Sequence, residues 1–281
     1  LRRNPCPIPT LEFRVASTNL TNQKRKEMKN LLPTITLLII SSLAFSQAND
    51  SGEVYAPVPA LVTGVMNGVP PSDAIVLFDG SNLDAWNRTA DDAPARWLIE
   101  DGAITVQRGV GTIKTRQAFG DMQLHVEFRP TDVIEGSGQG RANSGVFLHS
   151  LYEVQVLDSW ENDTYVNGQA GSIYKQQAPL VNVSRPPGQW QSFDIIFKAP
   201  VYSSAGELES PAYVTVLQNG VLVLNHFEIL GATFTESPEY AARCGPYSQE
   251  QRIQDCSGKM PITLQDHGQI VSFRNIWVRE L

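Results

Sequence analysis

From Asp73 to the C-terminus, short apolar runs alternate with turn residues, and this pattern constrains the fold more than any other feature of the sequence. Residues 97–100 and 103–106 flank Asp101-Gly102, and residues 212–217 and 221–224 flank Asn219-Gly220, two dipeptides typical of hairpin turns. Further strands are predicted over residues 74–78, 122–129, 144–149, 152–158, 190–197 and 270–278. No stretch has helical periodicity over three turns. Because one open sheet of so many strands is uncommon, we predict an all-β jelly-roll sandwich of two antiparallel sheets in a single domain.

The N-terminal part of the chain is predicted to lie outside this domain. Met28 opens a short polar start, residues 31–43 are apolar, and residues 44–48 supply small residues at the spacing of a cleavage site. The resulting interpretation is upstream non-native translation over 1–27, a secretory signal peptide over 28–48, a linker or N-terminal extension over 49–72, and the sandwich domain over 73–281. An uncleaved anchor is the alternative, although the apolar run is short for a membrane span. We therefore expect a periplasmic or extracellular protein with no membrane segment in its mature form.

The charge of the mature chain argues against a nucleic-acid partner. Residues 1–48 hold seven Lys and Arg side chains against two acidic ones, so cleavage would change the net charge from −7 to −12. A protein this acidic repels phosphate backbones, and the sequence has no basic stripe to offset the repulsion.

Two cysteines, Cys244 and Cys256, remain in the mature chain. An even pair in an exported protein is expected to form a disulfide. The competing interpretation, a metal or redox pair, has no support from the spacing, which matches no zinc pattern.

The strand predicted over residues 152–158 carries polar side chains within an apolar run. Glu153 and Gln155 share one face of a regular strand, and Asp158 points to the other face. A β-bulge between Gln155 and Asp158 would bring all three to the same face, and bulges recur beside active sites. Because polar groups on a buried sheet face are costly without partners, this strand is the first candidate for a functional site.

Several short stretches match, in order, the motifs of a known family. They are Leu77-Phe78-Asp79-Gly80, Asn143-Ser144-Gly145, the strand from Tyr152 to Asp158, Gly171-Ser172-Ile173-Tyr174, Pro187-Gly188-Gln189-Trp190, Asn219-Gly220-Val221, Leu264-Gln265-Asp266-His267-Gly268 and Phe273-Arg274-Asn275-Ile276. Through them the chain resembles the 3-keto-disaccharide hydrolase domain, formerly a domain of unknown function. That family has a concanavalin A-like jelly roll, similar in shape to laminarinase-type glucanases.

The resemblance implies cleavage of glycosides that are already oxidised at sugar carbon 3. A C3 ketone acidifies the C2 hydrogen, so a base can remove it, the enolate can expel the C1 oxygen, and water can add back. This route needs one base, one acid and a group that stabilises the enolate oxygen. In laminarinases the corresponding strand reads Glu-x-Asp-x-x-Glu, whereas here Gln155 replaces the helper carboxylate and Asp158 the final Glu, which disfavours ordinary retaining chemistry.

Four residues are the catalytic candidates on this basis: Glu153, Asp158, His267 and Arg274. Glu153 is the first choice for base or acid, and His267 is a second proton-transfer candidate because imidazole titrates near neutral pH. Arg274 is expected to stabilise the enolate or to pair with a carboxylate of the strand. The candidates for substrate binding are Asn143, Gln155 and His149 for sugar hydroxyls, Trp160 and Tyr174 for stacking on a pyranose ring, and Lys175 as a further enolate partner.

No metal or other cofactor is predicted, since no local ligand motif is present. The alternative is a metal ion held by His149, Glu153, Asp158 and His267, if the fold brings them together. The leading hypothesis is an exported hydrolase or lyase of 3-keto-glycosides or 3-keto-disaccharides. A non-catalytic carbohydrate-binding module on the same scaffold is the alternative, and a laminarinase-like glucanase is a second one. The sequence leaves open the sugar, the linkage, the oligomeric state, and which candidate is the base and which the acid.

Overall fold

The computed structural model describes residues 52–66, 68–233, 237–240 and 258–281. The chain divides into two compact units, residues 1–59 and residues 60–281. In the first unit, the described residues 52–59 form neither helix nor strand. The predicted signal peptide over 28–48 and the predicted disulfide between Cys244 and Cys256 lie outside the described residues.

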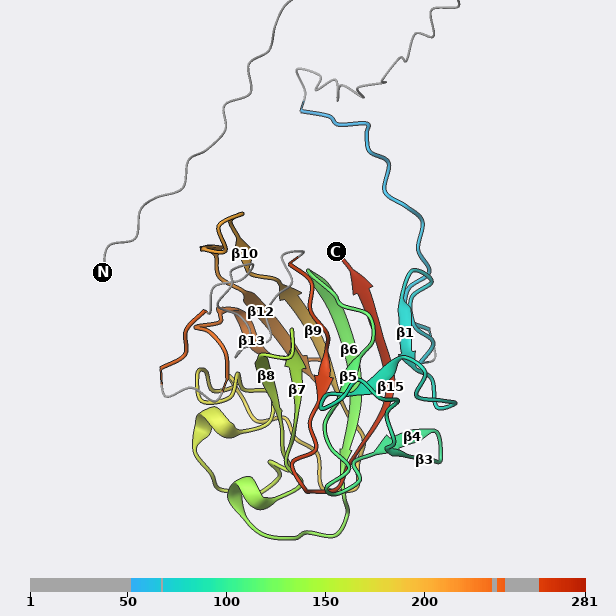
Figure 1. The fold of residues 1–281 in the computed structure, drawn as a ribbon, viewed down its shortest axis with the longest axis vertical. Helices are drawn as coiled ribbons and strands as arrows, with labels where there is room; N and C mark the ends of the chain where they lie inside the picture. The colour runs from blue at the N-terminus through green and yellow to red at the C-terminus, as the bar shows by residue number, and fades with distance from the viewer. Residues whose placement is uncertain (1–51, 67, 234–236, 241–257) are drawn as a thin grey trace, which may run out of the picture. The chain divides into compact units, whose positions relative to one another are not determined.

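The second unit is an antiparallel β-sandwich, as the sequence predicted (Figure 1). The larger sheet has eight strands in the order β13-β12-β9-β6-β15-β4-β3, with β1 also paired to β15. Their bounds are Ile75–Phe78 (β1), Leu98–Glu100 (β3), Ala103–Thr105 (β4), Met122–Pro130 (β6), Gln191–Lys198 (β9), Tyr213–Gln218 (β12), Val221–Glu228 (β13) and Val271–Glu280 (β15).

The second large sheet has five strands in the order β2-β5-β14-β7-β8. Their bounds are Trp86–Arg88 (β2), Ile113–Thr115 (β5), Ser144–Leu148 (β7), Tyr152–Val156 (β8) and Thr263–Leu264 (β14). A small pair, Val201–Tyr202 (β10) and Leu208–Ser210 (β11), and two short 3-10 helices, Gly138–Gly140 (η1) and Val166–Gly168 (η2), complete the described elements.

The core lies between the inner faces of the two large sheets. Along β6, Met122, Leu124, Val126 and Phe128 are buried and alternate with outer-face residues that are only partly buried. Along β8, the core residues are Tyr152, Val154 and Val156. The strand alternation therefore assigns Glu153 and Gln155 to the outer face of the five-stranded sheet.

The two predicted hairpins are confirmed. Asp101 and Gly102 connect β3 to β4 with φ angles of 50° and 71°, and Asn219 and Gly220 connect β12 to β13 with φ angles of 52° and 79°. Positive φ at both central residues is the signature of a type I′ turn, whose twist matches that of the flanking strands.

The structure differs from the sequence prediction at the end of β8. The ladder between β7 and β8 runs without a register shift from Tyr152 to Val156, and the strand ends there. Asp158 therefore lies in the segment that follows, and no bulge brings it onto the face of Glu153. Within the part of the chain that the structure describes, no helix is long and apolar enough to cross a membrane.

Candidate functional site

The candidate site lies on the outer face of the five-stranded sheet, where one row of residues crosses three strands. Gly145 of β7 pairs with Gln155 of β8. On the other side of Gly145, the backbone N–H of Gln265 donates to its carbonyl over 3.0 Å, just after β14 ends. Because glycine has no side chain, the row contains a notch between the two glutamines.

Glu153 fills part of this notch. A Cβ atom at position 145 would overlap Oε1 of Glu153 and would lie 2.8 Å from Cε2 of Phe147. Real Cβ atoms do not approach heavy atoms this closely, so only glycine leaves room for the Glu153 carboxyl. The Asn143-Ser144-Gly145 motif thus explains the position of the carboxyl in steric terms.

The Glu153 side chain is only 2% exposed, and its environment changes its acidity. Burial raises the pKa of Glu153 to about 8, because the charged form loses solvation. Its Oε2 atom is buried and has no hydrogen-bond partner among the described residues. The carboxyl is therefore protonated at neutral pH and can donate a proton to a group that enters the notch.

Gln155, which shares a face of β8 with Glu153, belongs to a connected network of amide side chains. Gln155 donates through Nε2 to Gln139 Oε1 over 3.0 Å and to Asn143 Oδ1 over 3.3 Å. Asn143 in turn donates through Nδ2 to the Gln139 carbonyl over 2.9 Å. The Oε1 atoms of Gln155 and Gln265 are buried without a partner among the described residues. Buried acceptors of this kind are costly, so a ligand with hydroxyl donors would satisfy them.

Aromatic side chains form the exposed rim of the site. The hydroxyls of Tyr165 and Tyr174 lie 2.5 Å apart, and Tyr165 is 41% exposed. Burial and this hydrogen bond raise the pKa of Tyr165. The backbone N–H of Tyr174 donates to the Glu153 carbonyl over 3.1 Å. The ammonium of Lys175 lies 5.5 Å from the Tyr174 ring centroid. These groups offer an apolar surface and hydrogen bonds beside Glu153.

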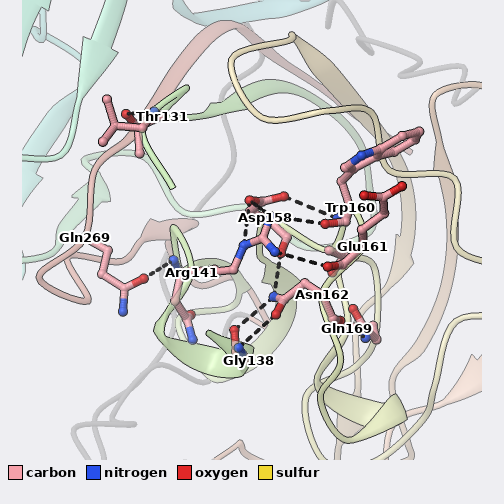
Figure 2. Close-up of polar contacts among 12 residues, drawn as sticks. Thr131, Gly138, Arg141, Asp158, Trp160, Glu161, Asn162, Gln169 and Gln269 are labelled. Atoms are coloured by element: carbon pink, nitrogen blue, oxygen red, sulfur yellow. Dashed lines mark hydrogen bonds and ion pairs between the residues drawn. The ribbon is translucent and has the colours of Figure 1, made fainter. Parts of the chain in front are cut away.

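Asp158 has a different role from the one expected for a second catalytic carboxylate. It is 2% exposed, and its carboxylate forms an ion pair with Arg141 and accepts the Trp160 backbone N–H over 3.2 Å (Figure 2). Arg141 also donates to the carbonyls of Trp160 and Glu161. The pair thus holds the loop after β8, while Trp160 itself is 38% exposed on that loop.

The loop that carries His267 is fixed next to the start of β7. Asp266 accepts the backbone N–H groups of Gly111 and Gly268, and Gln269 accepts the Asn143 backbone N–H over 2.6 Å. The Gln269 contact is visible in Figure 2. His267 is exposed on this loop, two residues before Gln269, which contacts Asn143 just ahead of β7.

Two expected site residues lie elsewhere. His149 is fully buried, and its Nε2 is 2.8 Å from the Phe119 carbonyl, so it has no access to a ligand in the notch. Arg274 belongs to β15 in the other sheet, where its Nε donates to Glu127 Oε2 over 2.6 Å. The sequence-based expectation that Arg274 lies beside Glu153 or Asp158 is wrong, because the hydrophobic core separates the two outer faces.

The sequence interpretation missed Gln139, Tyr165 and Arg141 as contributors to the site region. Gln139 lies in η1, Arg141 directly follows η1 and Tyr165 directly precedes η2, where no strand periodicity marks them. Gln265 belongs to the stretch from Leu264 to Gly268 that matches the family, but it was not predicted as a site residue. A polar side chain directly after a buried strand could have indicated it. Among the described residues, no group of three or more His, Cys, Asp and Glu side chains is arranged to hold a metal ion.

Comparisons with known proteins agree with this fold. Residues 73–279 match the family described as the 3-keto-alpha-glucoside-1,2-lyase-like domain. A curated 3-keto-disaccharide hydrolase from Bacteroides thetaiotaomicron is 26% identical over 248 residues, which cover 75% of this chain and 80% of that protein.

Two solved structures from Parabacteroides distasonis, each described as a putative glycosyl hydrolase, are also similar. One is 45% identical with a TM-score of 0.73, and the match covers 82% of this chain and 95% of the other. The second is 21% identical with a TM-score of 0.50, covers 74% of this chain and 94% of the other, and shows a shared fold.

Proposed function

The chain belongs to the 3-keto-alpha-glucoside-1,2-lyase-like domain family, and from this premise we propose that it cleaves glycosides or disaccharides oxidised at C3. It is a hydrolase of the glycosidase type by its relatives. The observation that carries the proposal is the buried Glu153 carboxyl over Gly145, protonated at neutral pH and with one oxygen unpartnered among the described residues. Such a group is suited to proton transfer inside a site that excludes water.

The reaction begins with removal of the C2 proton by a base. The electron pair of the C2–H bond is then delocalised onto the C3 carbonyl oxygen as an enolate. The enolate then expels the oxygen at C1, and the departing alcohol takes a proton, which leaves an unsaturated 3-keto sugar. Water adds back, with its oxygen bonding to C1 and a proton returning to C2. The net change is hydrolysis, and no oxidant or reductant is consumed.

In this scheme Glu153 is the proton donor, because its raised pKa keeps it protonated when the substrate arrives. His267 is the proposed base, because its side chain is exposed on a loop that the contacts of Asp266 and Gln269 hold next to Asn143. Gln155, Asn143 and Gln265 bind sugar hydroxyls through their amides, and the Tyr165–Tyr174 pair supports the sugar ring.

The geometry favours elimination over a two-carboxylate mechanism. A retaining glycosidase needs two carboxyl groups about 5–5.5 Å apart, one on each side of the scissile bond. Here Glu153 is the acidic residue of β8, Gln155 follows it on the same face, and Asp158, beyond the end of the strand, is already paired with Arg141. Glu153 is thus the strand's one carboxyl that has no cationic partner among the described residues.

The proposal is tested by incubating the protein with a 3-keto-disaccharide and, separately, with its unoxidised parent. We expect free sugar from the oxidised substrate alone, and slower turnover when C2 carries deuterium. Binding of both sugars without any turnover would instead favour a carbohydrate-binding module. Cleavage of unmodified β-glucan would favour a glucanase. An equal rate with the C2-deuterated substrate would count against proton removal as the slow step.

We also propose that the protein is exported after cleavage near Ala48 and that Cys244 pairs with Cys256. The support is the apolar run followed by small residues in the sequence, together with the even cysteine count that cleavage leaves. Mass spectrometry of the protein from cell fractions, before and after reduction, tests both points. A cytoplasmic chain that starts before residue 28, or two free thiols, would contradict them.

A further inference from the structure

A pocket of about 480 Å³ opens on the outer face of the eight-stranded sheet, on the side of the core opposite to Glu153. Its volume is within the range of about 300–1,000 Å³ that is typical of small-molecule sites. Val69, Val76 and Phe78 supply the apolar part of its wall, and Asp79, Glu127, Arg274 and Asn275 supply the polar part.

A network of side chains holds Arg274 and Asn275 in place. Glu127 accepts the Arg274 Nε–H over 2.6 Å through one oxygen and the Asn275 amide over 2.9 Å through the other. His125, whose Nε2 lies 3.9 Å from Glu127 Oε1, together with the hydrogen bonds from Asn275 and Arg274, lowers the pKa of Glu127 to about 2. The Arg274 guanidinium also stacks on Trp190, 4.1 Å from the ring centroid.

Several polar atoms of this network have no hydrogen-bond partner among the described residues. Glu127 engages only the Nε of Arg274, so the two terminal nitrogens of that guanidinium have no described partner. Asn275 donates through its amide nitrogen, and its Oδ1 has no described hydrogen-bond partner. Asp79 accepts from Ser81 through Oδ1, and its Oδ2 has no described hydrogen-bond partner. The Arg274 side chain is 41% exposed, which makes these donors accessible.

The backbone at this pocket is strained. Asn275 has a φ angle of 45° and lies where the register between β15 and β6 shifts, between Arg274 and Trp277. A left-handed non-glycine residue within a strand costs free energy and recurs at functional sites. The bulge places both Arg274 and Asn275 beside Glu127, which a regular strand would not do.

Two of the motif stretches named above line this pocket, a third supplies the ring on which Arg274 stacks, and the proposed catalytic site uses none of the three. Asp79 comes from the first stretch, Trp190 from the turn before β9, and Arg274-Asn275 from β15. These stretches are far apart in the sequence, and they converge on the face opposite to Glu153, which indicates a role separate from the catalytic site.

We propose that this pocket is a second, non-catalytic site that binds a neutral saccharide. Hydroxyl groups act both as donors and as acceptors, so they can satisfy the Arg274 donors and the Asn275 and Asp79 acceptors together. The apolar wall suits the C–H face of a sugar ring. A free anion fits less well, because Glu127 already compensates Arg274 and Asp79 adds negative charge.

The test follows the side-chain Nε–H signal of Arg274 by NMR in the full-length protein, with the signal assigned by its loss in Arg274→Lys. Cellobiose and maltose, both unoxidised, are the neutral probes, and glucuronate and inorganic phosphate are the anionic ones. We expect a saturable shift with at least one neutral probe.

Val69→Trp, which fills the pocket from an exposed position, should weaken that binding at least about tenfold. The matched control Val133→Trp, on an exposed loop outside the pocket lining, should leave it unchanged.

Turnover of a 3-keto-disaccharide separates this site from the catalytic one. Val69→Trp should keep wild-type turnover, and Glu153→Gln should keep the saccharide-induced shift of the Arg274 signal. No shift with either neutral probe, a shift with the anions alone, or an unchanged affinity in Val69→Trp would each overturn the proposal. Loss of turnover in Val69→Trp would contradict the independence of the two sites.

Discussion

Glu153 and Glu127 each point to the outer face of their sheet, yet the structure gives them opposite chemistry. Each alternates with core residues along its strand and points to an outer face. Glu127 is 20% exposed and bonds to Arg274 and Asn275, with His125 next to it, which lowers its pKa to about 2. Glu153 is buried with one oxygen unpartnered among the described residues, and its pKa rises to about 8. The partners, and not the position in the strand, decide whether a carboxyl is a structural anchor or a proton donor.

The largest expected effect concerns catalysis. Glu153→Gln keeps the shape of the side chain and removes the transferable proton, so we expect kcat for a 3-keto-disaccharide to fall by about 10²–10⁴-fold. Glu127→Gln is the matched control and should change kcat less than about threefold. Steady-state kinetics with both variants measures the contrast. Similar losses in the two variants would show that the proposed division of roles is wrong.

The pH dependence of stability should separate the two carboxyls next. The folded pKa of Glu153, about 8, lies above its ordinary value of 4.5, so its contribution is fully present below pH 4.5 and is lost as the pH rises to about 8. Relative to Glu153→Gln, the wild type should therefore lose up to about 1.4 kcal/mol of unfolding free energy per pH unit in this window. Denaturant unfolding of both proteins between pH 4 and pH 9 measures the difference, in which shared contributions such as that of His125 cancel. A constant difference over this range would contradict the raised pKa.

Glu127 should show the opposite sign. Its lowered pKa means that its contribution is present above pH 4.5 and is lost as the pH falls toward 2. Glu127→Gln leaves Arg274 without its anionic partner, so we expect a loss of about 1–3 kcal/mol at pH 7. The same denaturant experiment at pH 7 measures it, with Glu153→Gln as the comparison that loses no stability. An unchanged midpoint in Glu127→Gln would mean that the network around it stabilises little.

The sandwich could be predicted from the sequence because the pattern of apolar and polar residues along each strand reflects which face of that strand is buried. Two such local patterns are the alternation over β6 and the turns at Asp101-Gly102 and Asn219-Gly220. They depend only on neighbouring residues, so they can be recognised without a structure. The same local logic identified Glu153 and Gln155, since polar residues on a buried strand are costly. These predictions needed no knowledge of distant residues.

The rest of the site depends on contacts that local patterns do not encode. Arg274 pairs with Glu127 across 147 positions of the chain, and Asp158 pairs with Arg141 across 17. Which acid each arginine meets is a property of sheet order and loop path. The sequence could therefore name Arg274 and Asp158 as charged residues in unusual places but could not say that neither is available to the Glu153 site.

The smallest effect tests the steric origin of the Glu153 environment. In Gly145→Ala, the new methyl overlaps Glu153 Oε1 and must displace the carboxyl, so we expect kcat/KM to fall about tenfold through misplacement of the proton donor. Gly140→Ala is the matched control, because nothing lies within 4 Å of a Cβ at that position and its φ is not positive. If displacement exposes the carboxyl to water, the pH dependence of stability seen for Glu153 should also weaken in Gly145→Ala. Full activity in this variant would show that the notch between Gln155 and Gln265 does not set the position of the acid, and the contrast with Glu127 would then rest on hydrogen bonding alone.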